Sequence, residues 1–347
     1  MRACVLTATG GLAHLAVAEV PDPGPPGPGQ VRVAVQAAAL NHLDLFVAQG
    51  LPGVEYGFPH IMGADGAGLV DAVGAGVTRA VPGERVLINP GVADYSCAAC
   101  RAGEHPLCPN FRLLGEHLPG TLAEFVVVPE QNVERLPPLD PALTWAEAAA
   151  FSLVSLTAWR MVVTRARVQA GETVLVWGIG GGVSLAAMRI AKLVGAKTIV
   201  TSSSDAKLHA ARALGADVTL NHRTQNVGQE VRALTGKRGV EVVVENVGEA
   251  TWDTSLRVLA RGGRLVTCGA TTGPQVAIDL RRVFWHHWTI MGSTLGTLAE
   301  YAEIVRRLGR GELRPVVDRV YPLAEARAAL ERLAQGGQFG KIAVDIA

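Results

Sequence analysis

The stretch Thr173–Gly195, TVLVWG-IGGGVS-LAAMRIAKLVG, decides how the second half of this 347-residue chain folds. It begins with a short apolar run rich in β-branched residues, Thr173–Trp177, which is typical of a buried strand. A burst of glycines follows, and from Ser184 apolar residues recur at helical spacing. A strand, a glycine turn and a helix in this order place backbone N–H groups and the helix dipole against a pyrophosphate. The glycines expected to approach the phosphates of a dinucleotide are Gly178, Gly180, Gly181 and Gly182.

Strand and helix patterns alternate from about residue 153 onwards, which predicts a doubly wound parallel sheet and an α/β fold class. The expected strands are Val174–Trp177, Thr198–Thr201, Val218–Leu220, Val240–Val244, Arg264–Cys268 and Ile290–Ser293.

The first 150 residues are short strands separated by Pro and Gly, which favours a rolled, largely antiparallel β domain. The expected strands there are Cys4–Ala8, Leu15–Val20, Gln30–Ala38, Phe125–Val128 and Val133–Arg135. A last helix, Glu300–Leu308, and a last strand, Lys341–Asp345, are expected to return to this domain. We therefore predict a β domain of residues 1–152 and 296–347, with a nucleotide domain, 153–295, inserted into it.

Composition narrows the function classes. The net charge of +1 gives no broad footprint for nucleic acid, and no apolar run reaches the roughly 18–20 residues of a membrane span. The N-terminus is interrupted by glycines, His14 and Glu19, unlike a signal peptide. Three of the five cysteines lie within residues 97–108, which indicates a reduced compartment and a metal site. We expect a cytoplasmic protein.

The choice of nucleotide depends on the residues after the second strand of the parallel sheet. An Asp or Glu there would bind the adenosine ribose, but the sequence has Ser202 and Ser203, and Asp205 comes too late. Hydroxyl groups with Lys207 and Arg223 nearby suit a 2′-phosphate, so we expect NADPH to be preferred, with NADH possible. The alternative is that Lys207 is a solvated helix residue and the protein does not discriminate.

Segments along essentially the whole chain resemble the medium-chain dehydrogenase/reductase superfamily. They are Asn41–Asp44, GADGAG (63–68), the cysteine lobe (94–108), GTLAEFVVVP (120–129), TAW (157–159), the glycine turn, LGAD (214–217), GGRLVTCG (262–269) and GKIAV (340–344). The resemblance implies a GroES-like rolled β catalytic domain, a Rossmann domain and a cleft in which hydride moves to or from nicotinamide. It also implies nucleotide contacts from Thr157, Val183, Val247, Gly269 and Ser293.

The family's structural zinc site has four cysteines spaced C-x2-C-x2-C-x7-C. This chain matches it with Asp94, Cys97, Cys100 and Cys108. A carboxylate oxygen can complete a tetrahedral zinc shell beside three thiolates, so we expect one structural zinc per chain. The alternative is three cysteines without a metal.

Zinc alcohol dehydrogenases of this family also hold a catalytic zinc, usually through Cys, His and Cys. The matching residues here are Asn41, Ala64 and Leu153, none of which is a good metal ligand. Asn41 and Asp44 resemble instead the zinc-free quinone oxidoreductase and enoyl reductase branch, which adds hydride to the β-carbon of an α,β-unsaturated carbonyl. The resemblance makes Tyr56 the nearest match to a proton donor, although a packed aromatic is the alternative. Asn41, Tyr56 and His117 are the candidate catalytic residues.

Two segments keep further alternatives open. Glu116 and His117, with Asp65, could supply an acid or a rebuilt metal site. The segment DLRRVFWHHW (279–288) could meet an anionic carrier such as coenzyme A, or lie at a dimer edge. Because the apolar run Thr289–Met291 would expose an unpaired sheet edge, we expect a homodimer, with a tetramer possible.

The leading hypothesis is an NADPH-dependent reductase of activated C=C bonds in an enone, a quinone or a short or branched enoyl-CoA. The second is an alcohol or aldehyde dehydrogenase with a non-standard metal site. The third is a redox-silent NADPH-binding protein.

Overall fold

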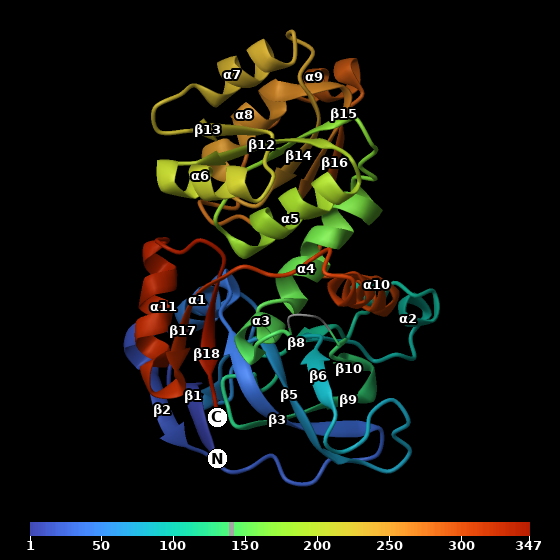
Figure 1. The fold of residues 1–347 in the computed structure, drawn as a ribbon, viewed down its shortest axis with the longest axis vertical. Helices are drawn as coiled ribbons and strands as arrows, with labels where there is room; N and C mark the ends of the chain where they lie inside the picture. Colours follow the sequence, from blue (N-terminus) through green and yellow to red (C-terminus); the bar gives the residue numbers. More distant parts are fainter. Residues whose placement is uncertain (139–141) are drawn as a thin grey trace. The chain divides into compact units, whose positions relative to one another are not determined.

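The computed structural model describes residues 1–138 and 142–347, and these form two compact units. The first unit contains Met1–Val154 and Gly296–Ala347, and the second contains Ser155–Leu295. Figure 1 shows the strands of the first unit in blue, cyan, green and red, because both ends of the chain contribute to it. The first boundary lies two residues after position 152, where the sequence analysis put it.

Antiparallel pairing dominates the first unit. A seven-stranded sheet has the order β10-β6-β5-β3-β18-β17 with β9 also on β3, and β2-β1-β4 and β7-β8 form smaller sheets. The strands are β1 Arg2–Leu6, β2 Leu15–Glu19, β3 Gln30–Ala39, β4 His60–Ile61, β5 Asp65–Val73, β6 Arg85–Ile88, β7 Gly91–Val92, β8 Arg112–Leu113, β9 Phe125–Pro129, β10 Val133–Arg135, β17 Val317–Pro322 and β18 Lys341–Asp345. The final strand β18 pairs with β3, so the end of the chain completes the sheet that the start of the chain begins.

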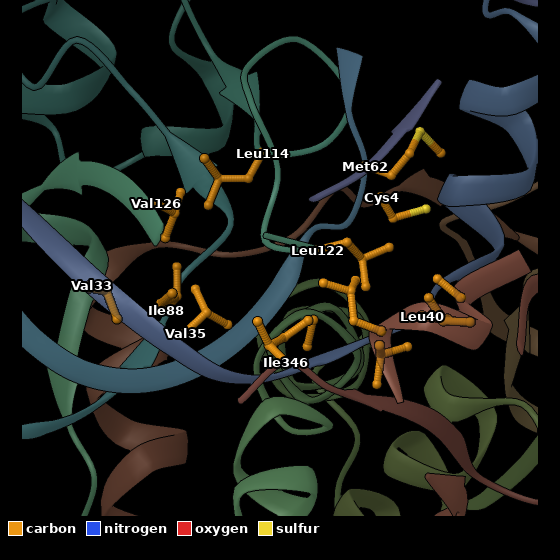
Figure 2. Packing of buried hydrophobic residues seen from close by; sticks show 14 of the residues in the cluster. Cys4, Val33, Val35, Leu40, Met62, Ile88, Leu114, Leu122, Val126 and Ile346 are labelled. Atoms are coloured by element: carbon orange, nitrogen blue, oxygen red, sulfur yellow. The ribbon is translucent and has the colours of Figure 1, made fainter. Parts of the chain in front are cut away.

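Alternation along β3 explains the core of this unit. Val31, Val33 and Val35 are buried, while the residues between them are partly exposed, as expected for a strand with one face on the core. Figure 2 shows Val33 and Val35 packed with residues from distant segments, including Leu122 and Ile346.

Short helices connect these strands. They are α1 His42–Gln49, α2 Ala98–Arg101, α3 Trp145–Ala149, α10 Leu298–Gly309 and α11 Ala326–Gln335, with α4 Ser152–Trp159 at the boundary between the units. Single turns of 3-10 helix lie at Leu12–His14, His105–Leu107, Glu130–Asn132 and Leu323–Glu325.

The second unit confirms the predicted doubly wound α/β fold. Its six strands are all parallel, in the order β13-β12-β11-β14-β15-β16. The strands are β11 Thr173–Val176, β12 Lys197–Ser202, β13 Val218–Asn221, β14 Val240–Glu245, β15 Leu259–Thr267 and β16 Thr289–Gly292. The helices are α5 Gly182–Leu193, α6 Asp205–Ala213, α7 Val227–Leu234, α8 Glu249–Val258 and α9 Leu280–His286, after a π-helical segment at Arg160–Arg165.

One helical stretch is longer and more apolar than the sequence pattern indicated. The helical stretch Trp145–Arg165 is long and apolar enough to cross a membrane by length and composition, but 78% of its most apolar window is buried inside the protein. A helix that is apolar all round is expected in a protein core as well as in a bilayer.

Candidate active site

The first unit contains a buried ion pair. The Nζ atom of Lys341, at the start of β18, donates to Asp65 Oδ2 at 2.8 Å and to Asn41 Oδ1 at 2.5 Å. The side chain of Lys341 is 4% exposed and that of Asp65 is not exposed. Because an isolated buried charge is costly, each partner requires the other.

Asn41 orients this ion pair, and its side-chain amide already donates to two protein acceptors. Its Nδ2 donates to Asp65 Oδ2 at 3.0 Å and to Ala39 O at 3.3 Å. The second carboxylate oxygen of Asp65 accepts from the backbone N–H of Leu153 at 2.8 Å. In this arrangement Asn41 holds the ion pair and is not available to donate to a substrate oxygen.

Asp44 forms the other half of a capping box with Asn41 at the start of α1. Its Oδ2 accepts from the Asn41 backbone N–H at 2.7 Å, which fixes the first turn of the helix. Burial raises the pKa of Asp44 to about 7. This carboxyl group can therefore change its charge near neutral pH.

Tyr56 and His117 belong to a second cluster, together with His60 and Glu116. The Tyr56 ring packs edge-on against His60 at 5.1 Å between centroids, and burial raises the Tyr56 pKa. His60 Nε2 hydrogen-bonds to Gly115 O at 3.0 Å. Glu116, whose pKa burial also raises, lies 3.6 Å from His117 Nδ1. Among the described residues, the buried Tyr56 hydroxyl has no hydrogen-bond partner.

The positions of these two clusters determine whether Asp65, Glu116 and His117 could bind a metal together. Asp65 is bound to Lys341, whereas Glu116 and His117 lie in the other cluster, so these three residues do not assemble a ligand set. In residues 1–138 and 142–347, the group of three or more metal-binding side chains that converges is Asp94, Cys97, Cys100 and Cys108.

The geometry of this lobe fits a zinc ion. One ligand atom from each of the four residues lies within 4.8 Å of the others, close to the span of a tetrahedral shell. Sγ of Cys97 accepts from the Cys100 N–H, and Sγ of Cys108 accepts from the Asn110 N–H, both at 3.4 Å. Asn110 Nδ2 also donates to Asp94 Oδ2 at 2.9 Å, which orients the carboxylate. If zinc binds, these residues hold it and it serves to fold the lobe.

The glycine turn of the second unit fits a nucleotide phosphate. Gly178 and Gly180 have φ of +66° and +120°, which residues with a Cβ rarely adopt. Gly181 is the N-cap of α5, so no side chain caps the first turn of this helix. The helix begins at Gly182, two residues before the predicted Ser184, and its N-terminus therefore includes Val183.

The loop after β12 contains the residues that were predicted to lie near the adenosine ribose of the nucleotide. Ser202 is buried, and its Oγ accepts from the Ser204 N–H at 3.2 Å. Ser204 is the N-cap of α6, which begins at Asp205, and Lys207 lies in its first turn. The Asp205 carboxylate accepts from Asn221 Nδ2 at 2.7 Å, so it already has a partner within the unit.

Other predicted nucleotide residues follow the strands of the same sheet. Val247, Gly269 and Ser293 lie just beyond the carboxyl ends of β14, β15 and β16, the edge at which such sheets bind ligands. Ser293 Oγ is buried without a partner among the described residues. Thr157 is buried in α4, Ser203 precedes the α6 cap, and Arg223 follows β13.

Sequence reasoning missed three residues. Lys341 was noted only as part of a family motif, and a Lys entering a buried strand was the available signal. His222 follows β13, with its ring 6.5 Å from that of Trp177. Asn246 follows β14 directly, which was the signal that it lies at the ligand-binding edge.

Known families match both units. Residues 27–138 match the alcohol dehydrogenase GroES-like domain, and residues 182–310 match the zinc-binding dehydrogenase domain. A solved NAD-dependent alcohol dehydrogenase is 44% identical with a TM-score of 0.94, over all of both chains. A quinone oxidoreductase of Pseudomonas aeruginosa is 32% identical over 90% of each chain. A crotonyl-CoA carboxylase/reductase of Cereibacter sphaeroides is 30% identical over 86% of this chain and 76% of its own.

Proposed function

Because this chain belongs to the medium-chain dehydrogenase/reductase superfamily, we propose that it is an NADPH-preferring reductase of activated C=C bonds. Its substrate is an α,β-unsaturated carbonyl compound: an enone, a quinone or a short or branched enoyl-CoA thioester. The family and its fold support an oxidoreductase that binds a pyridine nucleotide.

The observation that carries the proposal is the Asn41–Asp65–Lys341 network. Asn41 lies where the family has a zinc ligand, and both its amide oxygen and its amide hydrogens are committed to protein partners. Ala64 and Leu153, at the other two positions, offer no metal-binding side chain. Reduction of a simple ketone would leave an alkoxide without a Lewis acid, whereas conjugate addition gives an enolate that hydrogen bonds can stabilise.

Reduction also needs a proton donor. When bound, reduced nicotinamide supplies a hydride, which the β-carbon of the substrate receives. We assign the proton for the α-carbon to the Tyr56 hydroxyl, which regains a proton from solvent. A tyrosine hydroxyl is protonated at neutral pH, and burial raises the pKa of Tyr56 further. His117 is the alternative donor.

The relatives support this reaction class and a second one. The crotonyl-CoA carboxylase/reductase and the quinone oxidoreductase carry names that fit the reduction of conjugated substrates. The NAD-dependent alcohol dehydrogenase, at 44% identity, favours alcohol or aldehyde oxidoreduction as the second candidate. A redox-silent NADPH-binding protein is the third.

The remaining assignments complete the proposal. We propose that the lobe holds one structural zinc, that the protein is a cytoplasmic homodimer, and that it has no nucleic-acid or membrane partner.

We assign the preference for NADPH to Ser202, Ser203, Lys207 and Arg223. Lys207→Ala should weaken NADPH at least tenfold and leave NADH nearly unchanged, as expected for a lost charge-assisted hydrogen bond. Equal losses for both nucleotides would remove Lys207 from this role.

A substrate panel tests the reaction. Enones, quinones, enoyl-CoAs, aldehydes and alcohols are offered with NADPH and NADH, and nicotinamide absorbance is followed. Faster oxidation of simple alcohols than reduction of any enone, quinone or enoyl thioester would refute the proposal and favour the second candidate.

Tyr56→Phe then tests the donor. It should lower kcat by about 10²–10⁴-fold with nucleotide affinity unchanged. The matched control is Tyr321→Phe, which removes a hydroxyl on β17 and should have no effect. A silent Tyr56→Phe with a good substrate would transfer the donor role to His117.

A further inference from the structure

Glu245, the last residue of β14, fixes the turn that follows this strand. Its side chain is fully buried, and its Oε1 accepts from the backbone N–H groups of Val247 and Gly248 at 2.7 and 3.2 Å. Its Oε2 accepts from the Ser255 hydroxyl at 2.7 Å. The backbone around Asn246 is therefore held from the strand side before any ligand binds.

The side chain of Asn246 is held by Ser184, in the first turn of α5. The Ser184 hydroxyl donates its single hydrogen to Trp177 O at 2.7 Å. Its contact with Asn246 at 3.2 Å must therefore be an acceptance, which requires the Asn246 Nδ2 atom to face Ser184. The amide orientation is fixed, and Oδ1 points away from Ser184.

This Oδ1 atom is buried and has no hydrogen-bond partner among the described residues. A buried acceptor left unpaired is destabilising, so such an atom calls for an explanation. Its position suggests one. Ser184 lies in the helix turn that follows the glycine turn, and the neighbouring Val247 side chain lies 3.9 Å from where a Gly178 Cβ would be.

We propose that Asn246 Oδ1 accepts a hydrogen bond from an N–H or O–H donor of the bound nicotinamide nucleotide. An acceptor cannot bind a phosphate oxygen, which excludes the pyrophosphate as its partner. The donors that the nucleotide carries are its ribose hydroxyls, the carboxamide N–H group and the adenine amino group. The inference rests on the nucleotide binding in the proposed function, and not on the reduction of C=C bonds.

The test is the affinity of Asn246→Ala for NADH, measured by titration calorimetry on the full chain. We expect the Kd to rise roughly fivefold or more, as for one lost hydrogen bond in a buried site. Asn226→Ala, which removes the same side chain at the N-cap of α7, is the matched control and should leave the Kd unchanged. A change of less than twofold in the Kd of Asn246→Ala for NADH would overturn the proposal and would indicate that Oδ1 pairs with an ordered water.

Two analogues separate the possible donors. Acetylpyridine adenine dinucleotide lacks the carboxamide N–H, and ADP-ribose lacks the nicotinamide ring. If the carboxamide is the donor, both analogues should bind wild type and Asn246→Ala equally. If a ribose hydroxyl or the adenine amino group is the donor, the substitution should weaken NADH and the acetylpyridine analogue alike.

A second variant guards against a folding defect. Ser184→Ala keeps the Asn246 Oδ1 atom but removes the hydrogen bond that orients the Asn246 amide. It should therefore weaken the binding of NADH less than Asn246→Ala does. Thermal unfolding without nucleotide confirms that each variant is folded. If the protein binds NADH with this pattern yet reduces nothing in the panel, the inference holds and the proposed reaction fails.

Discussion

Lys341 and Asp65 carry opposite charges in a place that water does not reach, and Asn41 bonds to both of them. The three residues come from β18, β5 and the start of α1, so their network joins segments that lie up to 300 residues apart. The Coulomb attraction of a buried pair offsets its desolvation only when the remaining hydrogen-bonding atoms are satisfied. Asn41 and the Leu153 N–H satisfy them here.

We expect Lys341→Met to destabilise the first unit by about 3–5 kcal/mol, because it leaves the Asp65 carboxylate buried and unpaired. The double variant Asp65→Asn with Lys341→Met should recover most of this loss, since no charge then remains. The midpoint of urea unfolding at pH 7 measures both. Equal destabilisation of the single and double variants would show that the ammonium is held by packing and not by its charge.

Asp44 should make stability depend on pH. Burial raises its pKa from 3.8 to about 7, so between these values the folded protein keeps a proton that the unfolded chain has released. The free energy of unfolding should therefore fall as the pH rises through this window, by up to about 1.4 kcal/mol per pH unit for a single group. Asp44→Asn should remove this slope in urea unfolding between pH 5.5 and 8. Parallel profiles for wild type and variant would contradict the assignment.

At the scale of single elements, the lobe around α2 cannot be stabilised by its own core. Its buried apolar cluster contains Ala93, Cys100 and Cys108, with a few partly buried neighbours. A segment with so little apolar burial is expected to need another stabilising contact, which a structural metal would supply.

Elemental analysis should accordingly find about one zinc per chain in the wild type and almost none in Cys100→Ser. Cys4→Ala removes a buried cysteine outside the lobe and should keep the zinc. Asp94→Cys should keep it too, because a thiolate replaces the carboxylate. Two metals per chain, or full retention in Cys100→Ser, would contradict this site.

The sequence predicted elements better than contacts. The strands of the parallel sheet lie within a few residues of their expected places, because buried parallel strands form short apolar runs between helices. The first residue of a helix was predicted less accurately. Helix α5 begins at Gly182 and not at Ser184, because Gly181 can serve as its N-cap without a side-chain oxygen. The Lys341–Asp65 pair could not be predicted, since no local pattern records a contact across 276 residues.

At the scale of the whole molecule, β16 is one of the two edge strands of the sheet in the second unit, and β13 is the other. Strand β16 pairs with β15 on one side only, and helix α9 precedes it directly. In this single chain the side chains of Leu280, Phe284 and Trp285 on α9 are 65–69% exposed. Apolar side chains beside an unpaired strand are typical of a surface that another copy of the chain covers.

We therefore expect a dimer in which β16 pairs with the same strand of a second copy across a two-fold axis, which would join the two parallel sheets into one continuous sheet through an antiparallel pair. Light scattering at micromolar concentration should give twice the chain mass of 36.3 kDa. The double variant Phe284→Glu with Trp285→Glu should shift the protein towards the monomer, because it places charge against charge at the axis. Leu107→Glu changes an equally exposed leucine on the lobe and should leave the dimer intact. A monomeric wild type would refute this assembly, and a double variant that stays dimeric would place the interface on another surface.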